Sequence, residues 1–191
     1  MILFELTRED HPVYQHYSFL RSIISASLEM GKPFLSQHVL KALNFHAITC
    51  LHSYAGEYRP CPVKVGEHHP PEHYRVPALM DDLINTVNRT WDQTDPVLLA
   101  TYVLWRVNNI HPFINGNGRT ARAACYFILC LAAGGWLRGD PILPELIIQN
   151  HNEYCEHLQI AHDAFAVGVI YLDPLHAYVS RLLDQQLKSA V

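Results

Sequence analysis

The chain has 191 residues, of which 49% are hydrophobic, so it is long enough to bury one sizeable core. We expect a single domain over residues 1–191, because this length is near the usual size of one domain. The net charge of −4 at pH 7 excludes the general basic field that attracts nucleic acid or an anionic membrane, so any bound anion must be held locally.

The expected compartment is the cytoplasm. The first ten residues lack the basic start and long apolar stretch of a signal peptide. The longest apolar run, Ala123–Leu137, is shorter than the roughly 20 residues that span a bilayer, and it predicts a buried core helix. No C-x-x-C pair occurs among the cysteines, a pattern typical of reduced thiols; they are Cys50, Cys61, Cys125, Cys130 and Cys155.

Most of the chain has apolar residues at helical spacing, with almost no alternation of period two, which predicts a mostly α protein. The first helix is expected from Val13 to Glu29, with Gly31 and Pro33 marking its end. A second helix is expected from Ser36 toward His52. Further helices are expected over residues 77–91, 96–109, 119–133 and 144–165, and from Asp173 through Leu183.

One segment, residues 62–77, interrupts this helical pattern. Its prolines and a glycine preclude a long helix. Val63-Lys64-Val65-Gly66 is typical of a short extended piece that turns at the glycine, so we expect a loop or a small β-hairpin here. The predicted architecture is therefore an all-α helical bundle with one irregular arm.

The segment from His111 to Gly118 joins two predicted helices, and the second helix is expected to begin at Arg119. Glycines such as those in Gly116-Asn117-Gly118 allow backbone N–H groups to approach an anion closely. The new helix adds four unpaired amides and the positive end of its dipole. This junction therefore predicts a phosphate-binding site.

Three side chains around the junction favour chemistry on a polyphosphate. Arg119 and Arg122 are three residues apart, so they share one helix face, and two guanidinium groups suit a polyphosphate. His111 precedes a proline, which should end the preceding helix, and its imidazole suits a general base. Taken singly, a G-x-G marks an ordinary turn and a histidine before proline is structural. Their combination is far more specific.

The order H-P-F-x-x-G-N-G-R-x-x-R from His111 to Arg122 resembles the signature of the Fic family, H-P-F-x-(D/E)-G-N-G-R-x-x-R, and Asn115 is the only departure. Residues 55–59, 63–66 and 76–80 also resemble the family's region before this motif. The resemblance implies an all-helical Fic-type core with a small β-hairpin flap. It divides the chain into an N-terminal segment (1–33), the flap (60–76), a catalytic helix-loop-helix (95–135) and C-terminal helices (144–191).

The resemblance also implies a reaction, the transfer of AMP from ATP to a Ser, Thr or Tyr hydroxyl of a target protein. His111 would deprotonate that hydroxyl. The backbone of Gly116, Asn117 and Gly118 would hold the phosphates together with Arg119, and Arg122 would receive the γ-phosphate.

Two further regions acquire roles from the resemblance. The flap residues Val63, Lys64, Val65 and Gly66 would align the target by strand addition. Tyr154 falls where relatives line the adenine pocket, although a core tyrosine fits this position as well. His162 lies where many relatives have an asparagine near the nucleotide, and its role stays open. The histidine-rich segment 68–73 lacks a regular spacing of zinc ligands.

The residue that departs from the signature, Asn115, occupies the position that normally supplies a carboxylate to Mg²⁺. An amide oxygen carries no charge, whereas Mg²⁺ prefers carboxylates and substrate phosphates. The lost charge is expected to cost on the order of a few kcal/mol at an effective dielectric constant of about 20. We therefore expect weakened Mg²⁺ binding and slow or absent transfer.

The end of the first predicted helix resembles the family's inhibitory motif, (S/T)-x-x-x-E-(G/N). Ser25 and Glu29 match it, whereas Met30 replaces the final Gly or Asn. The resemblance implies that Glu29 pairs with Arg122 and blocks the γ-phosphate. The alternative is a surface glutamate at a helix end.

Two other functions stay open. The chain could be a nucleotide-binding protein that has lost catalysis, or an enzyme that uses another nucleotide or phosphoryl donor, because an anion site says little about the base. The expected partners are a nucleotide and a target protein of unknown identity, without nucleic acid or membrane. The oligomeric state, a homodimer included, is open.

Overall fold

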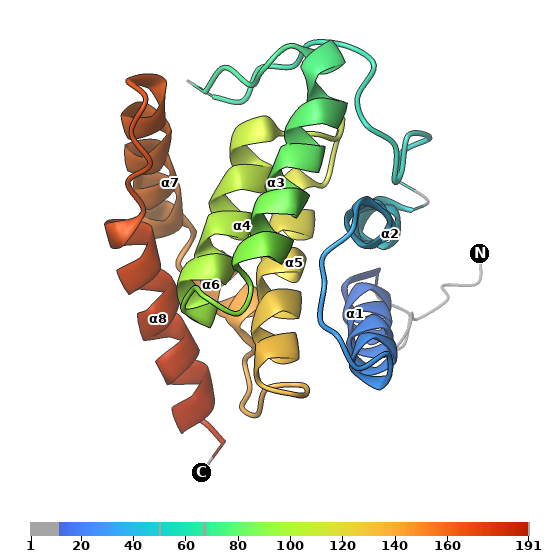
Figure 1. Ribbon diagram of the computed structural model, residues 1–191, viewed down its shortest axis with the longest axis vertical. Helices are drawn as coiled ribbons and strands as arrows, with labels where there is room; N and C mark the ends of the chain where they lie inside the picture. The colour runs from blue at the N-terminus through green and yellow to red at the C-terminus, as the bar shows by residue number, and fades with distance from the viewer. Residues whose placement is uncertain (1–11, 50, 67, 191) are drawn as a thin grey trace, which may run out of the picture.

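The computed structural model describes residues 12–49, 51–66 and 68–190, and over these residues the protein is all-helical. In Figure 1, α3, α4 and α5 occupy the centre, α1 and α2 lie to one side, and α7 and α8 lie to the other. The elements are α1 (Pro12–Glu29), α2 (Gln37–Ile48), α3 (Val76–Thr90), α4 (Pro96–Ile110), α5 (Asn117–Ala132), α6 (Leu143–Gln149), α7 (His151–Ala166) and α8 (Asp173–Lys188), with a single 3-10 turn at His73–Arg75.

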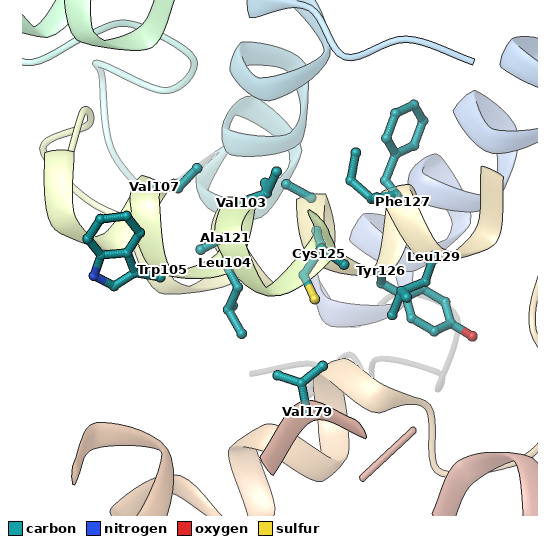
Figure 2. Close-up of a cluster of buried hydrophobic side chains, with 14 of the residues drawn as sticks. Val103, Leu104, Trp105, Val107, Ala121, Cys125, Tyr126, Phe127, Leu129 and Val179 are labelled. Carbon is teal, nitrogen blue, oxygen red and sulfur yellow. The ribbon is translucent and has the colours of Figure 1, made fainter. Parts of the chain in front are cut away.

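The core is built around α4 and α5, which pack against each other more extensively than any other pair of helices in the described part of the chain. Figure 2 shows Val103 and Leu104 of α4 beside Cys125 of α5, with Val179 of α8 facing them. All four side chains are fully buried. The prediction that the apolar run Ala123–Leu137 is a buried core helix is therefore confirmed for its first part, up to the end of α5 at Ala132, whereas the residues after it are not helical and are exposed or half-buried. Over the described residues, no helix combines the length and apolar character that crossing a membrane requires.

Local capping explains why several helix starts were predictable from the sequence. The Ser36 hydroxyl accepts a hydrogen bond of 3.2 Å from the amide of Val39 at the start of α2. The Asp95 carboxylate accepts from the amides of Val97 (2.9 Å) and Leu98 (3.0 Å) at the start of α4. These bonds satisfy amides that a helix start leaves free, so they place the boundary within a residue or two of the expected one.

Residues 144–165 are helical as expected, but they form two helices, α6 and α7, and not one continuous helix. They meet at Asn150, whose backbone dihedral angles (φ −108°, ψ 39°) are not helical. The Asn150 side chain donates a hydrogen bond of 2.8 Å to the carbonyl of Leu146. Such a local bond offers the backbone an alternative to the helical ladder, and the helix ends there.

The β-hairpin flap expected within residues 60–76 is not seen among the described residues of this segment, 60–66 and 68–76. The described part of this arm contains one isolated antiparallel bridge, in which Val65 and His68 exchange hydrogen bonds of 3.3 and 2.9 Å. The reason lies in the flanking prolines, which have no N–H to donate to a ladder and so prevent the bridge from extending into strands. They are Pro60, Pro62, Pro70 and Pro71.

Candidate active site

The loop between α4 and α5 begins at His111, which ends α4 in the left-handed conformation (φ 51°, ψ 59°). This conformation is uncommon for a residue with a Cβ and costs on the order of 1–2 kcal/mol, so the surroundings must stabilise it. The His111 amide donates to the carbonyl of Val107 (2.9 Å). Its carbonyl accepts from Arg59 Nε (2.8 Å). The position of the histidine is thus held from both sides of its backbone.

The imidazole of His111 is half-buried beside the arm. Burial, with smaller contributions from the nearby His68 and Arg59, lowers its pKa to about 4, against a backbone hydrogen bond at Asn108 that raises it. The ring is therefore neutral near pH 7 and has a free lone pair with which it can accept a proton.

Asn117 braces the loop through its side chain. Its Oδ1 accepts from the amide of Phe113 (2.9 Å), and its Nδ2 donates to the carbonyl of the same residue (2.8 Å). Phe113 is fully buried, so the loop is fixed to the core at this point. The side chain of Asn117 is therefore engaged within the loop and is not free to bind a ligand.

Asn44 of α2 is the second brace, and the sequence pattern did not single it out. Its amide nitrogen donates to the carbonyl of Asn115 (2.9 Å) and to the Thr120 hydroxyl (3.1 Å), while its oxygen accepts from the amide of Gly56 (2.9 Å). The side chain is fully buried. The available signal was a lone asparagine on the apolar face of a helix, which alone does not reveal its partners.

Gly116, the loop residue directly before α5, must be a glycine because of its backbone conformation and its close contact with α2. Its φ of 77° is left-handed, and a Cβ added there would lie 2.6 Å from Ile48 Cγ2 and 3.0 Å from Asn44 Nδ2. Any side chain would both strain the backbone and collide with α2. The close approach of α2 to the loop therefore depends on glycine at this position.

The helix α5 begins at Asn117, two residues before the expected start, and no side chain caps its first amides. Arg119 and Arg122 line one cavity of about 60 Å³ at this end of α5, together with His16 and Tyr17 of α1. Arg119 also donates a hydrogen bond of 2.6 Å to the carbonyl of Ala47. Free amides and two guanidinium groups thus gather at one end of the helix, as the spacing predicts.

The arm is tied to the loop by Arg59, of which only 2% is exposed. Its amide donates to the carbonyl of Pro112 (2.9 Å), and its guanidinium donates to the carbonyls of Cys61 (3.0 Å) and Pro71. The predicted flap residues Val63, Lys64, Val65 and Gly66 lie on this arm, where Lys64 and Gly66 are exposed.

A stacked histidine pair lies next to His111. The rings of His68, from the arm, and His162, from α7, are 4.1 Å apart and nearly parallel. Both rings contact Asn109: His68 Nε2 lies 2.8 Å from its carbonyl oxygen, and His162 Nδ1 lies 3.2 Å from its Nδ2. Burial lowers the pKa of His162 to about 4. In the described part of the chain, no three His, Cys, Asp or Glu side chains gather as metal ligands.

The side chain of Asn115 is exposed, and its Oδ1 accepts a hydrogen bond of 2.7 Å from the amide of Gly116. This oxygen is the donor that a Mg²⁺ ion would need, and it is neutral and already engaged. Because the loop offers no carboxylate beside it, the residues present do not fit a protein-held Mg²⁺ site.

Three predicted residues lie away from this cavity. Ser25 and Glu29 are exposed, and Glu29 is about 20 Å further along α1 than His16 at a rise of ~1.5 Å per residue. Among the ion pairs of the described residues, none joins Glu29 to Arg122. Tyr154 is buried, and its hydroxyl accepts from Asn108 Nδ2 (3.0 Å). The inhibitory role of Glu29 and the adenine contact of Tyr154 both stay predictions.

A helical bundle whose two central helices are joined by a glycine-containing loop is the arrangement expected of a Fic-type fold. The sequence profile of the Fic/DOC family matches residues 34–129, about half of the chain. The chain belongs to the Fic/DOC family, and the resemblance stated from its motif is confirmed.

Curated relatives carry the name Protein adenylyltransferase Fic. The protein of Drosophila yakuba is 34% identical over 111 residues, which are 56% of this chain and 21% of the relative. The protein of Aedes aegypti is 32% identical over the same length, covering 56% of this chain and 20% of the relative. The chain thus spans about a fifth of the length of these relatives.

Solved structures share the fold at low sequence identity. A fragment of Fic-1 from C. elegans has a TM-score of 0.76 and 20% identity, and the match covers 98% of this chain and 53% of that one. The BepC protein of Bartonella tribocorum, solved with bound AMPPNP, has a TM-score of 0.56 and 14% identity, with 91% and 88% covered. These likenesses establish the all-helical fold.

Proposed function

We propose that this chain is a protein adenylyltransferase, which transfers AMP from ATP to a Ser, Thr or Tyr hydroxyl of a target protein. The observation that carries the proposal is the neutral imidazole of His111 at the end of α4, joined by one short loop to the uncapped start of α5, where two arginines line one cavity. The names of the curated relatives and the nucleotide analogue in BepC support the same reaction.

In the proposed reaction, the His111 ring accepts the proton of the target hydroxyl as its oxygen attacks the α-phosphorus. A new P–O bond forms to the target, the bond to the β-phosphate breaks, and pyrophosphate leaves. The α5 amides and Arg119 bind the phosphates, and Arg122 binds the γ-phosphate. These groups hold the nucleotide so that its α-phosphate faces the histidine.

The arm is proposed to bind the target. Val63, Lys64, Val65 and Gly66 are flanked by prolines and form a single bridge, so backbone groups stay open to pairing with an extended segment of the target. Arg59 fixes the arm to the loop that begins at His111, so a segment bound to the arm would lie near His111, which supports this proposal.

A second candidate function is a nucleotide-binding protein whose transfer is weak or lost. It is favoured by Asn115, whose side-chain oxygen is neutral and already bonded to the Gly116 amide. In this case the protein would bind ATP at α5 and occupy its target without modifying it.

Labelling the chain with ATP separates these functions. Auto-modification is measured with ATP radiolabelled at the α-phosphate and, in parallel, at the γ-phosphate, for the wild type, His111→Ala and Asn115→Asp. AMP transfer predicts α-label without γ-label, loss of label in His111→Ala and more label in Asn115→Asp. Absence of label from both the wild type and Asn115→Asp, with ATP bound in calorimetry, would favour the second function.

A further inference from the structure

The cavity beside Arg119 and Arg122 has a third polar wall, formed by His16 of α1. Only 5% of His16 is exposed. Neither of its ring nitrogens has a hydrogen-bond partner among the described residues. Buried polar groups in proteins nearly always have partners, so an unpaired imidazole in the wall of a cavity indicates that a ligand belongs there.

The charges around His16 identify the sign of that ligand. Arg119 and Arg122 of α5 line the same cavity, and besides burial their charges, with that of His46 from α2, lower the pKa of His16. The pKa of its neighbour on α1, Tyr17, is raised by burial and by the carboxylate of Glu145 from α6, and it is lowered by Arg122. Burial first, and then the two arginines and His46, lower the pKa of His16 to about 4, so a neutral ring lies near cationic side chains. An anion would complement this arrangement.

The size of the cavity also fits. Its volume of about 60 Å³ compares with the roughly 10–15 Å³ that one water needs by the same kind of measure. This leaves room for a single tetrahedral oxyanion such as sulfate or one phosphate group. The whole nucleotide is too large for it, so only one end of a polyphosphate would enter.

We propose that His16 is a ligand of the phosphate group held by Arg119 and Arg122, and that it takes up a proton when this group binds. The inference deepens the proposed function, since it adds a residue and a proton to the nucleotide site. In the free protein a charged imidazole would face two arginines. In the complex the anion offsets their charge, and each N–H of the ring gains an acceptor.

Proton uptake makes binding depend on pH. Linkage requires that a group with a higher pKa in the complex strengthens binding as the pH falls. His16 starts from a pKa of about 4 and rises on binding, so anion affinity falls with increasing pH up to the pKa of the complex. The fall is at most about tenfold per pH unit for one proton. Above that pKa, His16 stays neutral and the dependence disappears.

The test uses sulfate, which stays a dianion throughout the range examined, so any linked proton belongs to the protein. Binding of sulfate to the full chain is measured by calorimetry at about pH 6, which is near the ordinary pKa of histidine. The measurement is made in two buffers of different ionisation enthalpy, so that proton uptake can be calculated. The expected result is net proton uptake. In parallel, ring resonances in nuclear magnetic resonance spectra should show that sulfate raises the pKa of His16 in the unmodified protein.

Two variants assign the proton. His16→Gln should bind sulfate without proton uptake, several-fold more weakly than wild type at about pH 6 and equally well at about pH 8. His46→Gln, which removes a neighbouring histidine outside the cavity wall, should keep the uptake. Thermal melting verifies that both variants are folded, and the resonance measurement on the wild type does not depend on either.

The inference is overturned if sulfate binds without proton uptake, if uptake persists in His16→Gln, or if sulfate does not bind at all. These outcomes are independent of the transfer reaction. Label transfer from ATP without proton-linked sulfate binding would leave the proposed function standing and remove only the role of His16. Proton-linked sulfate binding without label transfer would support the role of His16 and contradict the proposed transfer reaction.

Discussion

Arg59 Nε lies 2.8 Å from the carbonyl oxygen of His111, although 52 positions separate the two residues in the chain. This bond joins the irregular arm to the residue that ends α4 in a left-handed conformation. The same guanidinium also serves carbonyls of the arm itself. One buried side chain therefore sets both the geometry of the loop and the place of the arm beside it.

Replacing Arg59 by methionine should lower both stability and transfer. The change leaves three backbone carbonyls without their donor, and each buried unsatisfied group costs about 1–3 kcal/mol, part of which relaxation recovers. We expect the free energy of unfolding in urea to fall by roughly 2–4 kcal/mol. Arg89→Met, an exposed arginine of α3, is the matched control and should change it by less than about 0.5 kcal/mol. Equal effects of the two variants would contradict this role.

Gly116→Ala should be more damaging than an alanine at another left-handed glycine. Gly134 has a similar φ (73° against 77°), but a Cβ there meets nothing within 4 Å, whereas at Gly116 it meets Ile48 at 2.6 Å. Both changes incur the left-handed strain of about 1–2 kcal/mol, and only Gly116→Ala adds the collision. Chemical denaturation should show an extra loss of roughly 1–3 kcal/mol, and sulfate binding should weaken only in Gly116→Ala. Indistinguishable denaturation curves would exclude the collision.

Local signals explain which parts of the fold the sequence predicts well. The starts of α2 and α4 follow from Ser36 and Asp95, whose capping bonds reach two or three residues along the chain. The anion end of α5 follows from glycines and arginines within one short segment. In each case the deciding interaction is visible within one helical turn of sequence.

Long-range contacts explain what the sequence did not reveal. Asn44 supports the loop through residues more than 70 positions away, and His16 reaches the arginines from a separate helix. The flap was expected from extended-looking residues, yet flanking prolines limit it to the Val65–His68 bridge. The break at Asn150 depends on its side chain donating a hydrogen bond to the carbonyl of Leu146 and not to solvent. The contacts of Asn44 and His16 join distant segments, whereas the flap and the break at Asn150 depend on local groups whose outcome the helical pattern does not predict.

The stability of the protein should decrease in mild acid. His16 and His111 have pKa values lowered to about 4 in the folded state, against the ordinary histidine value of 6.5, which applies to the unfolded chain. The unfolded chain therefore binds more protons between these values, and the free energy of unfolding falls as the pH drops from about 6.5 toward about 4. Each histidine contributes at most about 1.4 kcal/mol per pH unit. Urea denaturation across this range should give a shallower slope for His16→Gln, and an unchanged slope would show that His16 titrates normally.

Asn115→Asp should strengthen metal binding at the loop. The aspartate supplies a charged oxygen in place of the amide, and the gain is on the order of 1–3 kcal/mol, which is about fivefold to 150-fold in affinity. Mn²⁺ binding in the presence of AMPPNP, followed by electron paramagnetic resonance, reports this without any turnover. Asn85→Asp adds the same charge on an exposed part of α3 and should leave Mn²⁺ affinity unchanged. Equal gains in the two variants would mean that net charge, rather than the position of Asn115, is responsible.

Glu29→Gly should raise auto-modification if the end of α1 restrains the nucleotide site. The carboxylate is exposed and lies far along α1 from the wall that His16 forms, so restraint requires α1 to shift toward Arg122. Removing the charge would free that arginine for the γ-phosphate, and label from α-labelled ATP should then increase several-fold. Glu156→Gly, at an exposed position of α7, controls for a general effect of placing glycine in a helix. Label that is unchanged or reduced in Glu29→Gly would assign the glutamate to the surface and leave His16 as the contact of α1 with the phosphate cavity.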